Sequence, residues 1–282
     1  MALMSPDPTR EVVDHIVDFF DRFAPIYDDW AGGQHGRVAA RLVDLAAPAK
    51  DEHVLDVGTG TGLVAHLVAP RVKPGVVLGI DLSAHMLTIA RRHTDKNLQF
   101  VGMAAEHLVF RPETFDLVTM GEALTYFADP TAALAEAHRV LRPGGRLAVS
   151  CQRRSLNTRA QELFFQGLTP LARRHYLSLP RYSSERAQFG EPHVLPKILA
   201  GAGFEVGGLT EMVTGGRASD AREWTELMAG AGPRPYTLIR ALGPRYRDEL
   251  EAEVEAAMAS LGDPDEAFRY HHSYVLVVAR KR

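Results

Sequence analysis

Cysteine is almost absent from this sequence of 282 residues, in which Cys151 is the single example. One thiol cannot form an intramolecular disulfide, and a cysteine-rich zinc cluster needs several. The fold must therefore be stabilised by packing, and a disulfide scaffold is excluded. The scarcity of cysteine also predicts a reducing compartment, which we expect to be the cytoplasm.

An excess of basic residues is also lacking, because 32 Lys and Arg stand against 35 Asp and Glu, a formal net charge of -3. This balance disfavours a nucleic-acid partner held by a basic field. No apolar run approaches the roughly 18 residues of a membrane span, and the first residues carry acids and prolines where a signal peptide has an apolar core. We therefore expect a compact protein without nucleic-acid partner or membrane insertion, and a homodimer stays open.

Short apolar runs alternate with helical stretches through the middle of the chain. Strands are expected at 53–57, 76–80, 98–101, 115–120 and 146–150, and helices at 63–69, 84–93 and 131–141. Such alternation predicts βαβ units and an α/β fold with a mostly parallel sheet that is covered by helices on both faces.

The segments around this alternation have a different character. An amphipathic helix that ends at Pro25 and a short helix at 36–47 precede the first strand. After Cys151 the apolar pattern weakens, and it resumes with a helix and two more strands at 192–202, 204–212 and 274–279. We therefore expect an N-terminal helical cap segment, a ligand-binding core, an inserted substrate cap, and the rest of the sheet with a helical excursion, at 1–50, 51–151, 152–190 and 191–282.

A glycine-rich turn, DVGTGTG, follows the first expected strand and begins at Asp56. Glycines let a ligand approach the backbone, where the N–H groups of the next helix point at it. The spacing differs from the GxGxxG of dinucleotide sites, and the lysine of a phosphate-binding loop is missing. The turn therefore predicts a nucleoside ligand without a phosphate tail, and a plain turn without ligand is the alternative.

Asp81 ends the second expected strand, where a carboxylate can accept hydrogen bonds from both hydroxyls of a ribose. The alternative role is to cap the helix that begins near Ala84. Ser83 is better placed for that cap, so we favour the ribose role for Asp81.

Four motifs in this order resemble a known family: VLDVGTGTG (54–62), GIDLSAHML (79–87), FDLVTMGEAL (115–124) and RVLRPGGRL (139–147). They are similar to the successive motifs of class I S-adenosylmethionine-dependent methyltransferases of the small-molecule type, which includes ubiquinone and menaquinone methyltransferases. The resemblance implies a Rossmann-like sheet with an antiparallel last strand and a small helical cap. It also implies S-adenosyl-L-methionine as cofactor and a small-molecule methyl acceptor.

The resemblance further implies which residues hold the cofactor. Gly58 and Gly60 would line its methionine part, and Leu82 and Met86 would pack on the adenine. Tyr27, in the stretch APIYDDW, is expected near the methionine tail. The complete expected set is Tyr27, Asp56, Gly58, Thr59, Gly60, Asp81, Leu82, Met86, Ala104, Ala105, Glu106 and Gly121.

One position departs from the family pattern. The usual GDAE after the third strand reads MAAE at 103–106, so that Ala104 replaces the aspartate that accepts from the adenine amino group. A hydrogen bond of this kind is worth about 1 kcal/mol, so its absence predicts weaker cofactor binding. The backbone of Ala105 or the side chain of Glu106 would then contact the edge of the ring.

Methyl transfer is an in-line displacement, so the protein must hold the acceptor close to the methyl group and exclude water. We assign no catalytic residue. The side chains that could contact the acceptor or act as a base are Glu122, Tyr126, His175, Tyr182 and His193. The pair His271 and His272 predicts no metal site, because neighbouring residues of a strand point to opposite faces.

Apolar and aromatic side chains are mixed through 156–189, which favours an apolar or aromatic acceptor such as a secondary metabolite or a quinone-like molecule. Methylation at O, N or C stays open. One alternative is a protein that holds S-adenosylmethionine structurally for another reaction, such as a cyclisation. A second is a degenerate, cofactor-sensing protein, which the absence of aspartate at Ala104 would suggest.

Overall fold

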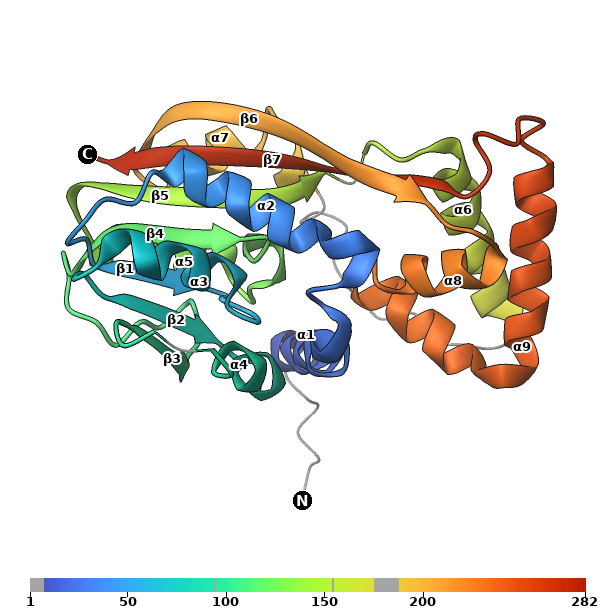
Figure 1. Cartoon of the computed structure of the whole chain (residues 1–282), viewed down its shortest axis with the longest axis horizontal. Helices are drawn as coiled ribbons and strands as arrows, with labels where there is room; N and C mark the ends of the chain where they lie inside the picture. The colour runs from blue at the N-terminus through green and yellow to red at the C-terminus, as the bar shows by residue number, and fades with distance from the viewer. Residues whose placement is uncertain (1–7, 94, 154, 175–187) are drawn as a thin grey trace, which may run out of the picture.

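The computed structural model describes residues 8–93, 95–153, 155–174 and 188–282. Within these ranges one seven-stranded sheet has the order β3-β2-β1-β4-β5-β7-β6 (Figure 1). The strands are β1 (Val54–Val57), β2 (Val77–Asp81), β3 (Leu98–Gly102), β4 (Phe115–Gly121), β5 (Leu141–Arg153), β6 (Phe204–Arg217) and β7 (Arg269–Lys281). Strands β1 to β5 pair in parallel, and β7 is antiparallel to both β5 and β6. The predicted Rossmann-like α/β fold is confirmed, including its antiparallel last strand.

Helices cover both faces of the sheet (Figure 1). Apolar side chains of α2 (Trp30–Ala46), α3 (Leu63–Val72) and α4 (Ala84–Ala90) pack on one face. Those of α5 (Pro130–Val140) and α7 (Leu195–Gly201) pack on the other. Successive residues of the central strands are buried on opposite faces, as with Leu117 and Val118, which explains their continuous apolar runs.

The register of the parallel strands brings the expected ligand-binding residues to one edge. Val57 pairs with Ile80, and Asp56 pairs with Thr119, so β1, β2 and β4 end side by side. The segments that follow these strands begin at Gly58, Leu82 and Glu122. Ligands of open α/β sheets bind at this carboxyl edge.

A separate helical lobe stands beyond the far ends of β6 and β7 (Figure 1). It contains α6 (Arg159–Arg174), α8 (Ala221–Ala229) and α9 (Pro233–Ala259). Trp224 of α8 is fully buried there, among residues such as Phe164 of α6 and Leu238 of α9. The described helix of the expected cap and the later helical excursion therefore share one hydrophobic core.

Several strands and one helix are longer than predicted. Strands β6 and β7 pair as far as Arg217 and Arg269, although their outer residues, TGGR and RYHHS, are mostly polar. Backbone pairing needs no apolar alternation, so the sequence pattern did not show this ribbon. Helix α2 likewise begins at Trp30, and its first turn is irregular, with positive φ at Ala31.

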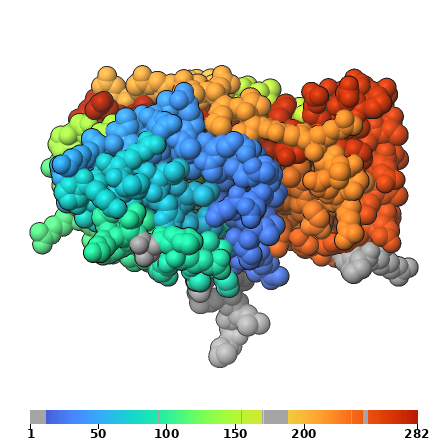
Figure 2. All heavy atoms as spheres, in the orientation of Figure 1, coloured from blue at the N-terminus to red at the C-terminus, as the bar shows by residue number. Residues whose placement is uncertain are grey.

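The N-terminal segment lies between the sheet and the lobe. Helix α1 (Pro8–Phe23) is followed by the short helix η1 (Ala24–Ile26). Phe19 and Phe23 form a hydrophobic cluster with Trp30, and this cluster packs against Leu227 and Tyr236 of the lobe. Figure 2 shows α1 in blue, adjoining the orange surface of the lobe. Among the described residues, no helix combines the length and apolar character that a membrane crossing needs.

Candidate functional site

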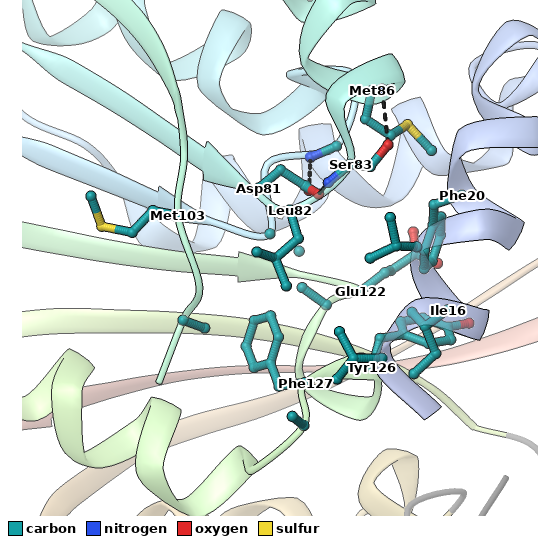
Figure 3. A pocket seen from close by; sticks show the side chains of 18 of the residues that line it. Ile16, Phe20, Asp81, Leu82, Ser83, Met86, Met103, Glu122, Tyr126 and Phe127 are labelled. Atoms are coloured by element: carbon teal, nitrogen blue, oxygen red, sulfur yellow. Dashed lines mark hydrogen bonds between the residues drawn. The ribbon is translucent and has the colours of Figure 1, made fainter. Parts of the chain in front are cut away.

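The main pocket lies at the carboxyl edge of the sheet and encloses about 750 Å³, including its open mouth. Figure 3 shows Ile16 and Phe20 of α1 on one side of it and Met103 on the other. The expected residues that line it are Tyr27, Gly58, Gly60, Asp81, Leu82, Met86, Ala105, Glu106, Gly121, Glu122 and Tyr126. The structure thus brings together segments that are distant in the sequence.

The remaining expected residues lie elsewhere. Asp56 and Thr59 line a neighbouring polar recess, and Ala104 is half-buried between two lining residues. His193 is exposed in the turn before α7. The predictions for His175 and Tyr182 fall outside the residues that the structure describes.

Two backbone groups hold the carboxylate of Asp81 in the pocket (Figure 3). The N–H of Gly60 donates to Oδ2 and the N–H of Ser83 donates to Oδ1, each over 2.8 Å. Burial raises the pKa of Asp81, which these hydrogen bonds oppose. Each oxygen keeps a lone pair for another donor. The Oγ of Ser83 accepts from the N–H of Met86, so the predicted helix cap is confirmed.

The glycine turn has one packed side and one open side. A Cβ at Gly58, where φ is +69°, would lie 2.5 Å from the Cβ of Ala123. A Cβ at Gly60, where φ is +56°, would meet no atom within 4 Å. Since Gly60 lines the pocket, a ligand can approach the turn at its backbone. The turn therefore fits a nucleoside cofactor.

Asp56 connects the glycine turn to β4. Its buried carboxylate accepts from the hydroxyls of Thr59 and Thr119, both over 2.6 Å. Burial raises the pKa of Asp56 to about 6, against a lowering effect of the two hydroxyls. Through these two hydrogen bonds, Asp56 thus fixes the glycine turn to β4.

Replacement of Asp56 by asparagine tests this burial. The folded protein holds the Asp56 proton more tightly than the unfolded chain, so the stability that it contributes is full below pH 3.8 and declines as the pH rises to about 6. The free energy of unfolding of the wild type, relative to Asp56→Asn, should fall by about 3 kcal/mol across this interval. Urea titrations of both proteins between pH 4 and 7.5 measure the difference. Parallel pH curves would contradict it.

Hydrogen bonds attach the N-terminal segment to the pocket. The hydroxyl of Thr61 donates to Asp28 over 2.6 Å, and that of Ser83 donates to Asp21 over 2.5 Å. Tyr27 lies between Asp21 and Asp28 in the sequence and lines the pocket, and burial raises its pKa well above the usual value. Sequence reasoning did not find the roles of Asp21 and Asp28, because only the tertiary structure shows their partners.

Glu122 and His35 form a pair at the end of β4. The Nδ1 of His35 lies 3.0 Å from Oε1 of Glu122, and the ring of His35 is parallel to that of Tyr27 at 4.1 Å. Sequence reasoning missed His35, since a histidine within the helical segment QHGRV carries no motif.

Two smaller cavities adjoin the main pocket at Glu122, and His35 lines both of them. The polar recess, of about 380 Å³, is lined by residues that include Asp56, Thr59, Thr61, His35 and Ser150. The aromatic recess, of about 340 Å³, is lined by Phe19, Phe20, Phe23, Tyr27, Trp30, His35, Glu122, Tyr126, Gln152, Gly230 and Ala231. Tyr27 and Glu122 line all three cavities.

The described residues contain no group of three or more His, Cys, Asp or Glu side chains that could hold a metal ion. His272 is buried, and its Nδ1 lies 3.0 Å from Nε2 of Gln152. Burial lowers the pKa of His272 to about 3. His271 instead contacts the carbonyl oxygen of Leu156.

The sheet order and the position of the pocket define a Rossmann-like α/β protein with a ligand pocket beyond the carboxyl ends of the parallel strands. Residues 55–149 match the family model of a methyltransferase domain. The chain is 33% identical over 201 residues to the demethylmenaquinone methyltransferase of Thermus thermophilus, with 66% of this chain and 91% of the relative covered. The chain belongs to the class I S-adenosylmethionine-dependent methyltransferases, and S-adenosyl-L-methionine is its cofactor.

Two further similarities are informative. The chain is 34% identical over 177 residues to the ubiquinone biosynthesis O-methyltransferase of Thiobacillus denitrificans, with 61% of this chain and 72% of the relative covered. The crystal structure of the [4+2]-cyclase SpnF has a TM-score of 0.55 and 19% identity, with 94% of each chain covered. At this identity the second similarity concerns the fold alone.

Proposed function

We propose that this enzyme transfers the methyl group to an oxygen or carbon atom of a small aromatic acceptor, such as a reduced quinone, by in-line displacement. One observation carries the proposal: the aromatic recess meets the main pocket at Tyr27 and Glu122. The names of the two relatives, which refer to menaquinone and ubiquinone, support an acceptor of this class.

For the cofactor, we propose that the main pocket holds the adenosine part. Asp81 would accept from the ribose, and Leu82 and Met86 would supply apolar surface for the adenine, since all three line the pocket. One oxygen of Glu106 already accepts from the N–H of Asp129 over 3.1 Å, which fixes this carboxylate beside the pocket. We propose that Glu106 and the backbone of Ala105 bind the edge of the adenine, since Ala104 has no acceptor on its side chain.

For the methionine tail, we propose the backbone of Gly58 and Gly60, the ring of Tyr27 and the polar recess, whose hydroxyls suit amino and carboxylate groups. When bound, the cofactor supplies an electrophilic methyl group on a positively charged sulfur. The protein holds the acceptor in line with that group and excludes water.

For the acceptor, we propose the aromatic recess. Phenylalanine, tyrosine and tryptophan rings provide flat apolar contacts, and Gln152 adds a polar group. Gly230 and Ala231 place one wall of the recess in the helical lobe, and the N-terminal segment supplies another. The part of the N-terminal segment at 8–50 and the lobe would thus act together as the cap over the acceptor.

Calorimetry followed by a turnover assay tests the proposal. The purified protein should bind S-adenosylmethionine and S-adenosylhomocysteine, and should form S-adenosylhomocysteine when reduced naphthoquinones or naphthols are added. Absence of cofactor binding would contradict the placement of the nucleoside. Binding without product formation from any aromatic acceptor would contradict the acceptor class.

A further inference from the structure

We propose that the carboxylate of Glu122 is the catalytic base that takes the proton of an O–H acceptor, and that His35 is its positioning residue. This inference rests on the proposed function and names the group that completes it. The observation behind it is that one carboxylate borders the cofactor pocket and the acceptor recess at once.

The backbone of Glu122 has a strained conformation, which neighbouring groups hold in place. Its φ of +53° lies in the left-handed region, which is unfavourable for a glutamate. The backbone N–H of Glu122 donates to the carbonyl oxygen and to the hydroxyl of Ser150, both over 3.0 Å. Strained residues of this kind cluster at functional sites, where the surrounding structure holds them. The chain turns at Glu122 instead of continuing along β4, and this turn brings the carboxylate to the cavities.

His35 fixes the carboxylate. Its Nδ1 contacts Oε1, and its ring lies between Tyr27 at 4.1 Å and Trp30 at 5.3 Å. With Glu122 ionised, Nδ1 carries a proton and donates it to Oε1, and the other ring nitrogen of His35 is Nε2. This Nε2 is buried and has no hydrogen-bond partner within the described part of the chain. The second oxygen of Glu122 can then receive a proton while His35 holds the first.

Four of the neighbouring titratable groups are uncharged near pH 7. Burial raises the pKa of Tyr27 and Tyr274 well above the usual value, and that of Cys151 to about 12, with Glu122 adding to each effect. His272 is neutral as well, because burial lowers its pKa to about 3. Tyr126 of the short helix η2 (Leu124–Tyr126) also lines both cavities. Glu122 is therefore the carboxylate that the two cavities share.

The proposed step moves a methyl group to the acceptor oxygen and a proton to Glu122. The acceptor oxygen forms a bond to the methyl carbon with one of its lone pairs. The carbon–sulfur bond breaks, and its electron pair stays on sulfur, which becomes neutral. The proton of the acceptor hydroxyl moves to Glu122, which later releases it to solvent.

The test is a comparison of two naphthols in Glu122→Gln, a variant that keeps the size of the side chain. At saturating S-adenosylmethionine and neutral pH, kcat with 1-naphthol, which carries its proton, should fall by about 100-fold. With 4-nitro-1-naphthol, which has already lost its proton, kcat should stay within about threefold of the wild type, because no base is needed. His35→Asn should give a smaller loss with 1-naphthol and shift its pH profile.

The matched control is Glu226→Gln, which changes an exposed glutamate of the lobe and should leave both rates unchanged. Equal losses with both naphthols, or no loss with either, would overturn the role of Glu122. If the wild type binds S-adenosylmethionine but methylates neither naphthol nor any reduced naphthoquinone, the proposed acceptor class fails and this inference falls with it. The two failures are distinguished by the wild-type rate.

Discussion

Replacement of Asp81 by alanine is expected to weaken S-adenosylmethionine binding by ~1.5 to 3 kcal/mol, or roughly 10- to 150-fold. The variant loses a charged acceptor for the ribose hydroxyls. It also frees the N–H groups of Gly60 and Ser83, which the carboxylate holds at 2.8 Å. Calorimetric titration with S-adenosylmethionine measures the effect.

Two comparisons make this result specific. Asp81→Asn keeps one acceptor oxygen and the shape of the side chain, so its loss should be smaller than that of alanine. Asp44→Ala removes an exposed aspartate that pairs with Arg71, and should leave the affinity unchanged. Wild-type affinity in Asp81→Ala would show that the ribose is bound elsewhere.

The substitution Gly58→Ala is expected to destabilise the glycine turn by about 2 to 4 kcal/mol. A positive φ of +69° disfavours alanine, and the new Cβ would lie 2.5 Å from that of Ala123. The turn must shift, so both the free energy of unfolding and the cofactor affinity should decrease. Urea unfolding and calorimetry measure the two quantities.

The double variant Gly58→Ala, Ala123→Gly separates the two causes. Removal of the methyl group of Ala123 relieves the closest contact but leaves the unfavourable φ, so it should restore part of the stability. Phe127, whose ring would lie 3.3 Å from the new Cβ, limits the recovery. A double variant no better than Gly58→Ala would mean that backbone strain alone is responsible.

Much of the sheet was predictable because its signals are local. A buried strand, a glycine turn and a helix follow one another within 54–72, and the acidic residue at the end of β2 follows at Asp81. The helix cap at Ser83 could also be predicted, since it depends on neighbouring residues. Parallel pairing then determines that the ends of β1, β2 and β4 meet.

The acceptor side was less predictable because its contacts join distant segments. His35 and Glu122 are separated by 87 positions, and only Glu122 lies in a recognisable motif, so the sequence did not show that the two side chains meet. In the lobe, Trp224 packs with residues of α6, although α7 and β6 lie between α6 and Trp224 in the sequence. Periodicity shows that such helices have apolar faces, but not which faces meet.

Three aromatic side chains separate the main pocket from the aromatic recess. Phe20, Tyr27 and Tyr126 line both the main pocket and the aromatic recess. A ligand that moves one of these rings in the first cavity changes the shape of the second. The affinities of the two cavities are then linked, and thermodynamic reciprocity makes the effect equal in both directions. If bound cofactor changes the affinity for the acceptor by some factor, bound acceptor changes the affinity for the cofactor by the same factor.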